Sequence, residues 1–260
     1  MKVLVVCITY GRLPFLGRMV ASFLNQNYDD KELLIINDDR NVQLSCTHNG
    51  YDNSIIHIIN LNTRLSLGAK RNLGSAFGNY DLYMPHDDDD IFLPNRISNH
   101  VAKHKENPDI SLYWNSASYT IYGDNFSLDG NSVTAISYKQ PAWFACGGYA
   151  DMGSGEDQDF YNKMQNKLIE RDPSKVDYVY NWGGINYHAT FSSVENVADI
   201  AENQLRDLGV YGSKYEIVPD WYEYDKFCLL DRLYKEGRRD LLVKHTDLAK
   251  IDVSHLEANV

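Results

Sequence analysis

Residues 3–12 read Val3-Leu4-Val5-Val6-Cys7-Ile8-Thr9-Tyr10-Gly11-Arg12. The run over residues 3–8 is apolar and rich in β-branched side chains, which is typical of a strand buried on both faces of a sheet. Polar residues and a glycine then replace the apolar run, so a turn is expected at residues 9–12. The stretch therefore predicts a buried first strand with polar side chains at its carboxyl end.

A helix and a second buried strand follow this first strand. Pro14 stands where proline can open a helix, and apolar residues recur at helical spacing over residues 13–24. Residues 32–37 (ELLIIN) form the next apolar run. A strand, a helix and a strand in this order predict a right-handed βαβ unit with parallel strands, and hence an α/β fold.

Polar residues come directly after each of these two strands. Thr9 and Tyr10 follow the first strand, and Asp38 and Asp39 follow the second. Ligands of open α/β sheets bind beyond the carboxyl ends of the strands. We therefore expect these residues at a binding edge, although the two aspartates also suit a loop cap.

Two further strands and one helix extend the pattern. Residues 54–60 read as a third strand and residues 68–77 as a helix of small residues. Lys70 and Arg71 lie in the first turns of that helix, where cations oppose the helix dipole. Their placement favours an anionic partner such as a phosphate, and a solvated helix face is the alternative for each. Residues 80–84 form the next strand.

An acidic run, Asp87-Asp88-Asp89-Asp90, follows that strand. Adjacent carboxylates repel one another, so the run favours a positive partner. Mg²⁺ and Mn²⁺ prefer carboxylate oxygens and leave positions open for substrate phosphates. Within the run we expect Asp90 to begin the next turn and Asp88 to be solvated. A wholly solvated acidic loop is the alternative.

The remaining sequence predicts mixed structure and then helices. We expect helices at residues 95–106, from 156 to about 171, at 194–208 and at 225–237, and strands at 111–115, 118–122 and 176–182. A β-hairpin is expected across 110–140, with a turn signal at 129–131. Glu156 and Asp157 suit helix capping as well as catalysis. His188 falls on a loop, as a surface residue or a ligand.

Length, charge and cysteine content limit the classes of protein to which this chain can belong. A length of 260 residues fits one large domain, or one domain with an appendage. No segment approaches the ~18 apolar residues of a membrane helix, so no integral membrane segment is expected. The net charge of −11 disfavours non-specific binding to nucleic acid. The four cysteines are scattered, which favours free thiols and a cytoplasmic location.

Five motifs, in order over roughly residues 1–190, resemble those of the family 2 glycosyltransferases with a GT-A fold. Residues 9–12 (TYGR) are similar to T-Y-N-R, and the helix after them closes on a matching S-x-L-x-Q-x-Y pattern at residues 22–28. Residues 36–39 (INDD) are similar to V-D-D, and residues 68–74 (GAKRNLG) are similar to the A-R-N signature. Residues 87–94 (DDDDIFLP) are similar to D-x-D-D-x-x-x-P, and residues 147–160 are similar to G-G-F…G-E-D-x-D-L. Gly11, Lys70, Arg40 and His86 depart from the usual pattern.

The resemblance implies a Rossmann-like mixed sheet flanked by helices, the GT-A fold. Residues 1–190 would form the glycosyltransferase domain, with a nucleotide-sugar-binding half at 1–108 and an acceptor half at 109–190. Residues 191–260 match nothing in the family and are expected to be a helical C-terminal extension.

The resemblance also implies a role for each matching residue. Thr9, Tyr10, Asp38, Asp39, Arg71 and Asp87 would contact the nucleotide. Asp89, with Asp87, would bind Mn²⁺ or Mg²⁺ at the diphosphate, and His188 is a candidate for a further metal contact. Asp157, beside Glu156, would be the general base that deprotonates the acceptor hydroxyl. The donor would be a nucleoside-diphosphate sugar, most often UDP-linked, and the reaction would invert the anomeric centre.

Two alternatives and the acceptor stay open. A nucleotidyltransferase would need a glycine-rich phosphate loop after the first strand, where this chain has one glycine. A non-catalytic sugar-nucleotide-binding protein would have no need of Asp157. The acceptor could be a glycan, lipid, protein, small molecule or modified DNA base, and the last would suit a viral enzyme.

Overall fold

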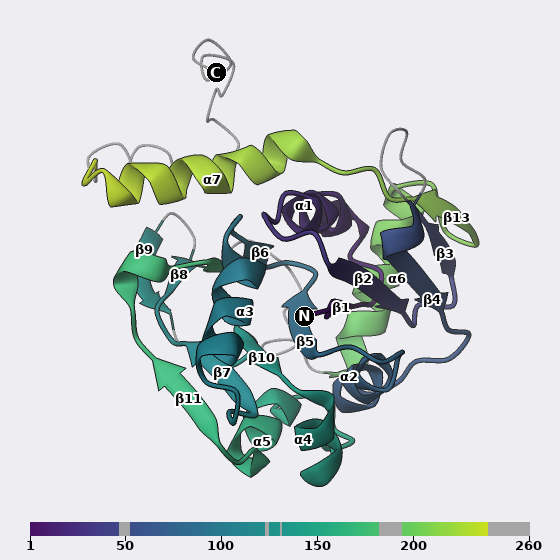
Figure 1. Cartoon of the computed structure of the whole chain (residues 1–260). Coiled ribbons are helices and arrows are strands. Elements are labelled where there is room, and N and C mark those ends of the chain that lie inside the picture. The colour runs from purple at the N-terminus through teal and green to yellow at the C-terminus, as the bar shows by residue number, and fades with distance from the viewer. Residues whose placement is uncertain (47–52, 123–124, 131, 182–193, 239–260) are drawn as a thin grey trace.

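The computed structural model describes residues 1–46, 53–122, 125–130, 132–181 and 194–238. A seven-stranded mixed sheet forms its centre, in the order β11-β7-β10-β5-β1-β2-β4 (Figure 1). The strands are β1 (Val3–Thr9), β2 (Lys31–Asn37), β4 (Ile56–Asn60), β5 (Leu82–Asp87), β7 (Leu112–Asn115), β10 (Ile136–Tyr138) and β11 (Lys167–Glu170).

Four of these strands form the parallel half that the sequence predicts. β2 and β5 flank β1, and β4 lies outside β2, with every pair parallel. The connecting helices are α1 (Leu13–Leu24) and α2 (Leu67–Ser75). The chain crosses the sheet in opposite directions through them, so right-handed crossovers place them on opposite faces. Figure 1 shows α1 above the strands and α2 below them.

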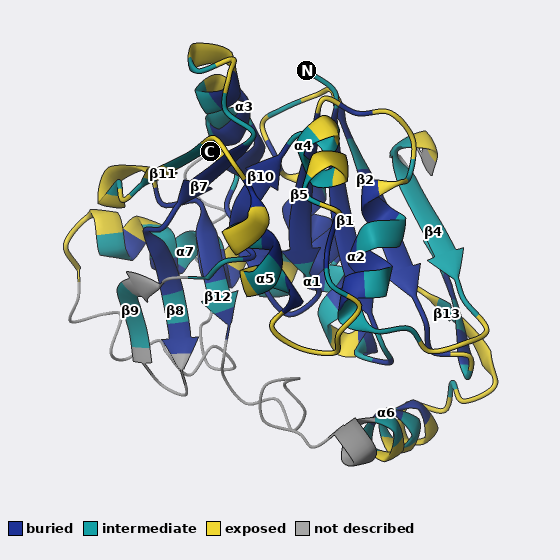
Figure 2. Cartoon of the chain, turned by 90° about the horizontal axis from the view of Figure 1, so that it is seen from below, coloured by how far each residue is buried: buried dark blue, intermediate teal, exposed yellow. Residues whose placement is uncertain are grey.

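The other half of the sheet is antiparallel at its centre. β10 pairs antiparallel with both β5 and β7, which makes the sheet mixed. The helices beside this half are α3 (Arg96–Glu106), α4 (Gln140–Ala145) and α5 (Glu156–Lys163). The apolar core follows the central strands β1, β2, β5, β7 and β10, which are mostly dark blue in Figure 2. The α/β fold with a mixed sheet and flanking helices is therefore confirmed.

Two smaller sheets complete the fold. One has the order β6-β12-β8-β9, formed by β6 (Ile91–Phe92), β8 (Ser118–Tyr122), β9 (Asn125–Gly130) and β12 (Tyr178–Asn181). The other pairs β3 (Val42–Ser45) with β13 (Ser213–Glu216). Helices α6 (Val194–Asp207) and α7 (Trp221–Lys235) and two short 3₁₀ turns, η1 (Asn53–Ile55) and η2 (Pro173–Lys175), account for the rest. None of the described helices is long and apolar enough to span a membrane.

Two local predictions are wrong. The helix that begins at Glu156 ends at Lys163, because Asn166 has a left-handed φ of 50° and the next residues pair with β7 as β11. The residues expected to turn at 129–130 instead end β9, where Gly130 pairs with Ser118. Strand β3 (Val42–Ser45) is not predicted by the local pattern, because its partner strand β13 is far along the chain.

Helix α2 packs closely against β1. A Cβ built on Gly74 would stand 2.3 Å from Cγ1 of Val6, so only glycine permits this approach. Lys70 and Arg71 lie on the same helix, and both are buried. The close packing therefore fixes the height at which these cations stand over the sheet.

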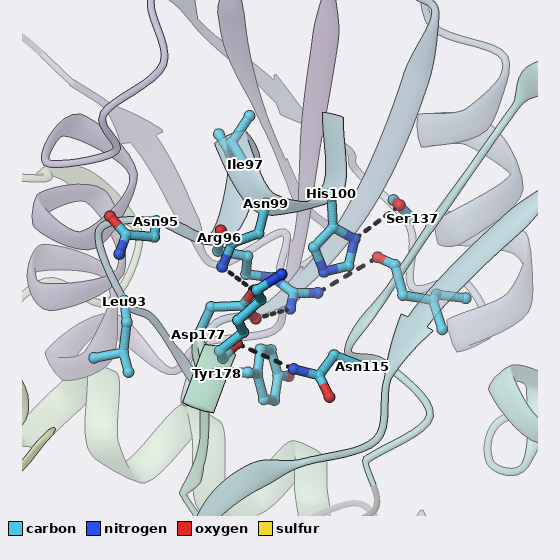
Figure 3. Close-up of polar contacts among 12 residues, drawn as sticks. Leu93, Asn95, Arg96, Ile97, Asn99, His100, Asn115, Ser137, Asp177 and Tyr178 are labelled. Atoms are coloured by element: carbon cyan, nitrogen blue, oxygen red, sulfur yellow. Dashed lines mark hydrogen bonds and ion pairs between the residues drawn. The ribbon is translucent and has the colours of Figure 1, made fainter. Parts of the chain in front are cut away.

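A buried polar cluster joins α3 to β12 and the main sheet (Figure 3). The Arg96 guanidinium lies 3.0 Å from Oδ1 of Asp177, and Asn99 donates to Oδ2 of the same carboxylate at 3.0 Å. Arg96 also lies over the rings of Phe92 and Tyr178, 4.4 and 4.7 Å from their centroids. Its side chain is fully buried, so the cluster holds β12 in a set position beside the loop after β5.

Replacing Gly74 with alanine tests the close packing of α2. We expect Gly74→Ala to lower the free energy of unfolding by about 1–3 kcal/mol, because the new methyl overlaps Val6. Gly153→Ala is the control, since a Cβ there meets no atom within 4 Å. Urea denaturation of both variants measures the difference, and equal stabilities would contradict the packing.

Removing the two charges of the Arg96 cluster singly and together tests its energetics. Arg96→Met leaves the buried Asp177 carboxylate without its cation, so we expect a loss of about 3–5 kcal/mol. The double variant with Asp177→Asn removes both charges and should recover much of that loss. A double variant less stable than Arg96→Met, measured by urea denaturation, would contradict this account.

Candidate active site

The predicted site residues meet at the carboxyl ends of β1, β2 and β5. Asp87, the last residue of β5, is in register with Ile8, and Thr9 is in register with Asn37 at the end of β2. Asp38 follows at once, and its backbone N–H lies 3.5 Å from the Thr9 carbonyl. The structure thus brings Thr9, Asp38 and Asp87 to one rim.

Asp38 is held by contacts from the following loop and from α2. The Lys70 ammonium lies 2.8 Å from Oδ1 of Asp38, and the Leu65 backbone N–H donates to Oδ2 at 2.8 Å. Burial lowers the pKa of Lys70, although the adjacent Asp38 opposes that shift. The anionic partner predicted for Lys70 is therefore a carboxylate of the protein itself.

Arg71 joins two carboxylates from opposite halves of the chain. Its Nη2 donates to Oδ1 of Asp87 and its Nε to Oε1 of Glu156, both at 2.9 Å. Burial alone would raise the pKa of Asp87, but Arg71 outweighs it and the pKa is lowered. For Glu156 burial prevails over Arg71 and raises the pKa. Arg71 thereby fixes the N-terminus of α5 beside the end of β5.

Arg12 neutralises the middle of the acidic run. Its Nε and Nη2 contact the Asp88 carboxylate, and its Nη1 donates to Oδ2 of Asp89 at 2.7 Å. Asp88 is fully buried, so its expected solvation is wrong. Burial raises the pKa of Asp88 to about 6 against the opposing Arg12 charge. The short turn after β5 buries this carboxylate, and sequence spacing could not show that.

Asp90 and His86 fasten the acidic run to its neighbours. The Tyr178 hydroxyl donates to Oδ2 of Asp90, and the Asn181 backbone N–H donates to Oδ1 at 2.9 Å. His86 stacks on Phe92 with ring centroids 3.7 Å apart, and burial lowers its pKa to about 3. The neutral imidazole therefore packs as part of the core, a role the sequence did not suggest.

The donor set of Asp87 and Asp89 fits a magnesium-like cation that is shared with a ligand. Within the described residues no three His, Cys, Asp or Glu side chains group as a metal site. Mg²⁺ in nucleotide sites needs only one or two carboxylates, because phosphates and waters supply the other ligands. Arg71 contacts Oδ1 of Asp87, and Arg12 contacts Oδ2 of Asp89. Each guanidinium therefore contacts one of the two oxygens of its carboxylate. His188 lies outside the described residues.

A pocket of about 340 Å³ adjoins Asp38. Its lining comes from the ends of β1, β2 and β4 and from α6: Tyr10, Asp38, Arg40, Asn41, Asn62, Thr63, Arg64, Ala198 and Glu202. The Arg64 guanidinium lies over the Tyr10 ring, 4.6 Å from its centroid. Asp39 is turned away and accepts the Asn41 backbone N–H at 2.9 Å. The sequence showed Arg40 only as a departure from the family pattern. It gave no sign of Arg64 or of the two α6 residues, which carry no motif.

Asp157 stands at the start of α5, next to the buried Glu156. Gly155 precedes the helix with a φ of 76°, which turns the chain into α5. The Arg71–Glu156 ion pair sets the orientation of this first turn. Burial and the charges of Asp90, Asp87, Asp89 and Asp157 raise the pKa of Tyr180. The negative charges of the acidic run and of Asp157 thus both reach the Tyr180 hydroxyl.

Comparisons with known proteins agree with this geometry. Residues 4–150 match the model of "Glycosyl transferase family 2". A Bacillus subtilis (strain 168) protein named "Uncharacterized glycosyltransferase YwdF" is 33% identical over 111 residues, which are 42% of this chain and 40% of that protein. The chain thus spans less than half of that relative.

Solved structures share the fold at low sequence identity. S. aureus TarS 1-349 in complex with UDP-GlcNAc has a TM-score of 0.57 at 12% identity, over 100% of this chain and 77% of that one. The complex of the same protein with UDP has a TM-score of 0.54 at 14% identity, over 70% and 60%. The mannosyltransferase PcManGT from Pyrobaculum calidifontis, in complex with GDP-Man and Mn²⁺, has a TM-score of 0.52 at 12% identity, over 91% and 64%.

These neighbours identify the observed sheet and its flanking helices as the GT-A fold. The family model covers more than half of the 260 residues, including the first four of the five motifs and the start of the last. The chain belongs to glycosyl transferase family 2.

Proposed function

We propose that this protein transfers a sugar from a nucleoside-diphosphate sugar to an acceptor hydroxyl, with inversion at the anomeric carbon. One observation carries the proposal: Arg71 links Asp87, at the end of β5, to Glu156, at the start of α5. The link joins Asp87, a candidate ligand of the cation at the donor diphosphate, to the first turn of α5. That turn also carries Asp157, the candidate base for the acceptor.

The nucleoside half of the donor would lie in the pocket next to Asp38. Tyr10 and Arg64 offer a flat surface against which a base can stack. Asp38, held by Lys70 and the Leu65 N–H, is positioned to accept an N–H from the ligand. The structural neighbours are complexes with UDP, UDP-GlcNAc and GDP-Man, which supports a nucleotide-sugar donor. UDP is the nucleotide that the motif resemblance favours.

Asp87 and Asp89 would hold Mn²⁺ or Mg²⁺ at the diphosphate. When bound, such an ion supplies a Lewis acid that stabilises charge on the departing nucleoside diphosphate. A neighbour that contains Mn²⁺ supports this assignment. Arg71 contacts Asp87 and Arg12 contacts Asp89, and these contacts orient the two carboxylates. His188 stays a candidate ligand.

Asp157 would act as the general base. Its carboxylate would remove the proton of the acceptor hydroxyl as that oxygen attacks the anomeric carbon from the side opposite the diphosphate. Asp157 lies in the first turn of α5, at the positive end of the helix dipole, which is a favourable place for a carboxylate. Direct displacement with a single base inverts the configuration. Glu156 would be a positioning residue, because it holds Arg71 and the first turn of α5.

The division of the chain follows from this assignment. We propose residues 1–108 as the donor half, 109–190 as the acceptor half and 191–260 as an extension. The acceptor class is left open, and a modified DNA base stays a minority hypothesis that the net charge disfavours. A cytoplasmic location stays a prediction from the scattered cysteines.

A nucleotide panel tests donor binding. We expect one nucleoside diphosphate, UDP foremost, to raise the melting temperature by about 5 °C at a hundredfold excess over Kd with Mn²⁺ present. Asp89→Asn should abolish the part of the shift that depends on Mn²⁺, because it removes a carboxylate that can bind the ion. Asp109→Asn, on the exposed surface, is the control. An undiminished Mn²⁺-dependent shift in Asp89→Asn would contradict the metal assignment.

Release of nucleoside diphosphate from a sugar-nucleotide panel tests the general base. We expect Asp157→Asn to lower kcat by about 10²–10⁴-fold while donor Kd stays near the wild-type value, because the base touches the acceptor. Asp159→Asn is the matched control, since Asp159 lies two residues beyond Asp157 on the same helix and pairs with Lys163. Equal kcat in Asp157→Asn and wild type would contradict the role.

The same assay separates the alternatives. A nucleotidyltransferase would release pyrophosphate from a nucleoside triphosphate. A non-catalytic binding protein would show the thermal shift with no donor consumed.

A further inference from the structure

We propose that helix α6, which lies outside the family-matched region, forms a wall of the nucleobase pocket, and that Glu202 on this helix sets which base the pocket accepts. This inference rests on the proposed function, in which the pocket beside Asp38 holds the nucleoside. It gives residues 191–260, which match no family motif, a part in donor recognition.

The first observation is the close approach of α6 to the turn after β1. A Cβ built on Gly11 would stand 2.9 Å from Cβ of Ala201 and 2.8 Å from Oδ2 of Asp39. Gly11 has a φ of 67°, which other residues rarely adopt. Ala201 and Leu205 are fully buried, and Leu205 belongs to the main core. Gly11, where the family motif usually has asparagine, therefore makes room for α6 against the donor rim.

The second observation is the strand that follows α6. β13 pairs in parallel with β3 from Ser213 to Glu216. The Gly212 backbone N–H donates to the carbonyl of Asn41, a pocket residue, at 2.7 Å. Figure 1 shows β13 beside β3, and Figure 2 shows α6 beyond the carboxyl ends of the parallel strands. Two contacts thus fix the position of α6. Leu205 packs in the main core, and the segment after the helix pairs with β3 and bonds to the pocket loop through Asn41.

The third observation is the chemistry that α6 presents. Ala198 and Glu202 stand one turn apart on the helix, and both line the pocket. The Glu202 side chain is 35% exposed, and its Oε1 accepts the Tyr211 hydroxyl and an Arg206 N–H at 3.4 Å. These contacts hold the carboxylate in place. Tyr10 and Arg64 supply a flat face, whereas Glu202 supplies an acceptor at the edge.

An ionised carboxylate can only accept hydrogen bonds. Guanine presents two adjacent N–H donors at its pairing edge, whereas uracil presents one N–H between two carbonyl oxygens that a carboxylate repels. A glutamine amide can both donate and accept. Replacing Glu202 by glutamine should therefore favour uracil relative to guanine, whichever base the wild-type protein prefers.

Isothermal titration with UDP and with GDP, each in the presence of Mn²⁺, tests both parts of the inference on the full chain. Ala198→Leu should raise the Kd of the preferred nucleotide by about tenfold or more, because the larger side chain fills part of the pocket. Asn203→Leu, an exposed position of the same helix, is the control and should leave Kd within about twofold. Melting temperatures confirm that each variant is folded.

The second pair of variants tests Glu202. Glu202→Gln should shift the ratio of the UDP and GDP dissociation constants toward UDP by about threefold to tenfold. Asp207→Asn, an exposed carboxylate on the same helix, should leave the ratio unchanged. Because Glu202→Gln is nearly isosteric, this pair still tests the inference if Ala198→Leu lowers the melting temperature.

The outcomes separate the inference from the proposed function. If wild type binds a nucleotide but Ala198→Leu binds it equally well, α6 is not a wall of the pocket. An unchanged or reversed ratio in Glu202→Gln would overturn the role of Glu202. If the wild type binds neither of these nor any other nucleoside diphosphate of the thermal-shift panel, the proposed function fails and the inference fails with it.

Discussion

The site depends on one buried interaction, in which Arg71 contacts both Asp87 and Glu156. Arg71 is 5% exposed, so its charge must be balanced within the protein. The two carboxylates that balance it come from β5 and α5, elements far apart in the sequence. Removing Arg71 would leave the buried Glu156 carboxylate without its cation, and such a loss is strongly destabilising. The same ion pairs thus stabilise the fold and align the two halves of the site.

Charge balance also explains how the acidic run can exist. Arg12 contacts Asp88 and Asp89, Arg71 contacts Asp87, and Tyr178 with Asn181 binds Asp90. Each carboxylate has a partner, and Asp88 and Asp89 share Arg12, so the run is four distinct positions and not one anionic patch. Only Asp87 and Asp89 combine a single contacted oxygen with a place at the rim, which is why we assign them to the cation.

Local pattern was enough to predict the elements that position the site. The apolar run at residues 3–8, the helical spacing at 13–24 and the motifs that follow gave the parallel half of the sheet and its rim. The pattern failed where distant segments decide the outcome. Asn166 and the pairing of β11 ended α5 early, β3 found its partner in β13, and the tight turn buried Asp88. The lining of the pocket by α6 left no trace in any motif, because helix packing alone places it there.

The central claim is inverting transfer from a nucleoside-diphosphate sugar, and the anomeric configuration of the product tests it most directly. Proton NMR can follow the reaction of the wild-type protein with an α-linked donor and water or an acceptor. Diamagnetic Mg²⁺ is used as the ion, and the anomeric coupling is read before the free sugar equilibrates. Inversion predicts that the β-anomer appears first, together with free nucleoside diphosphate. Appearance of the α-anomer first, or of no sugar from any donor, would contradict the claim.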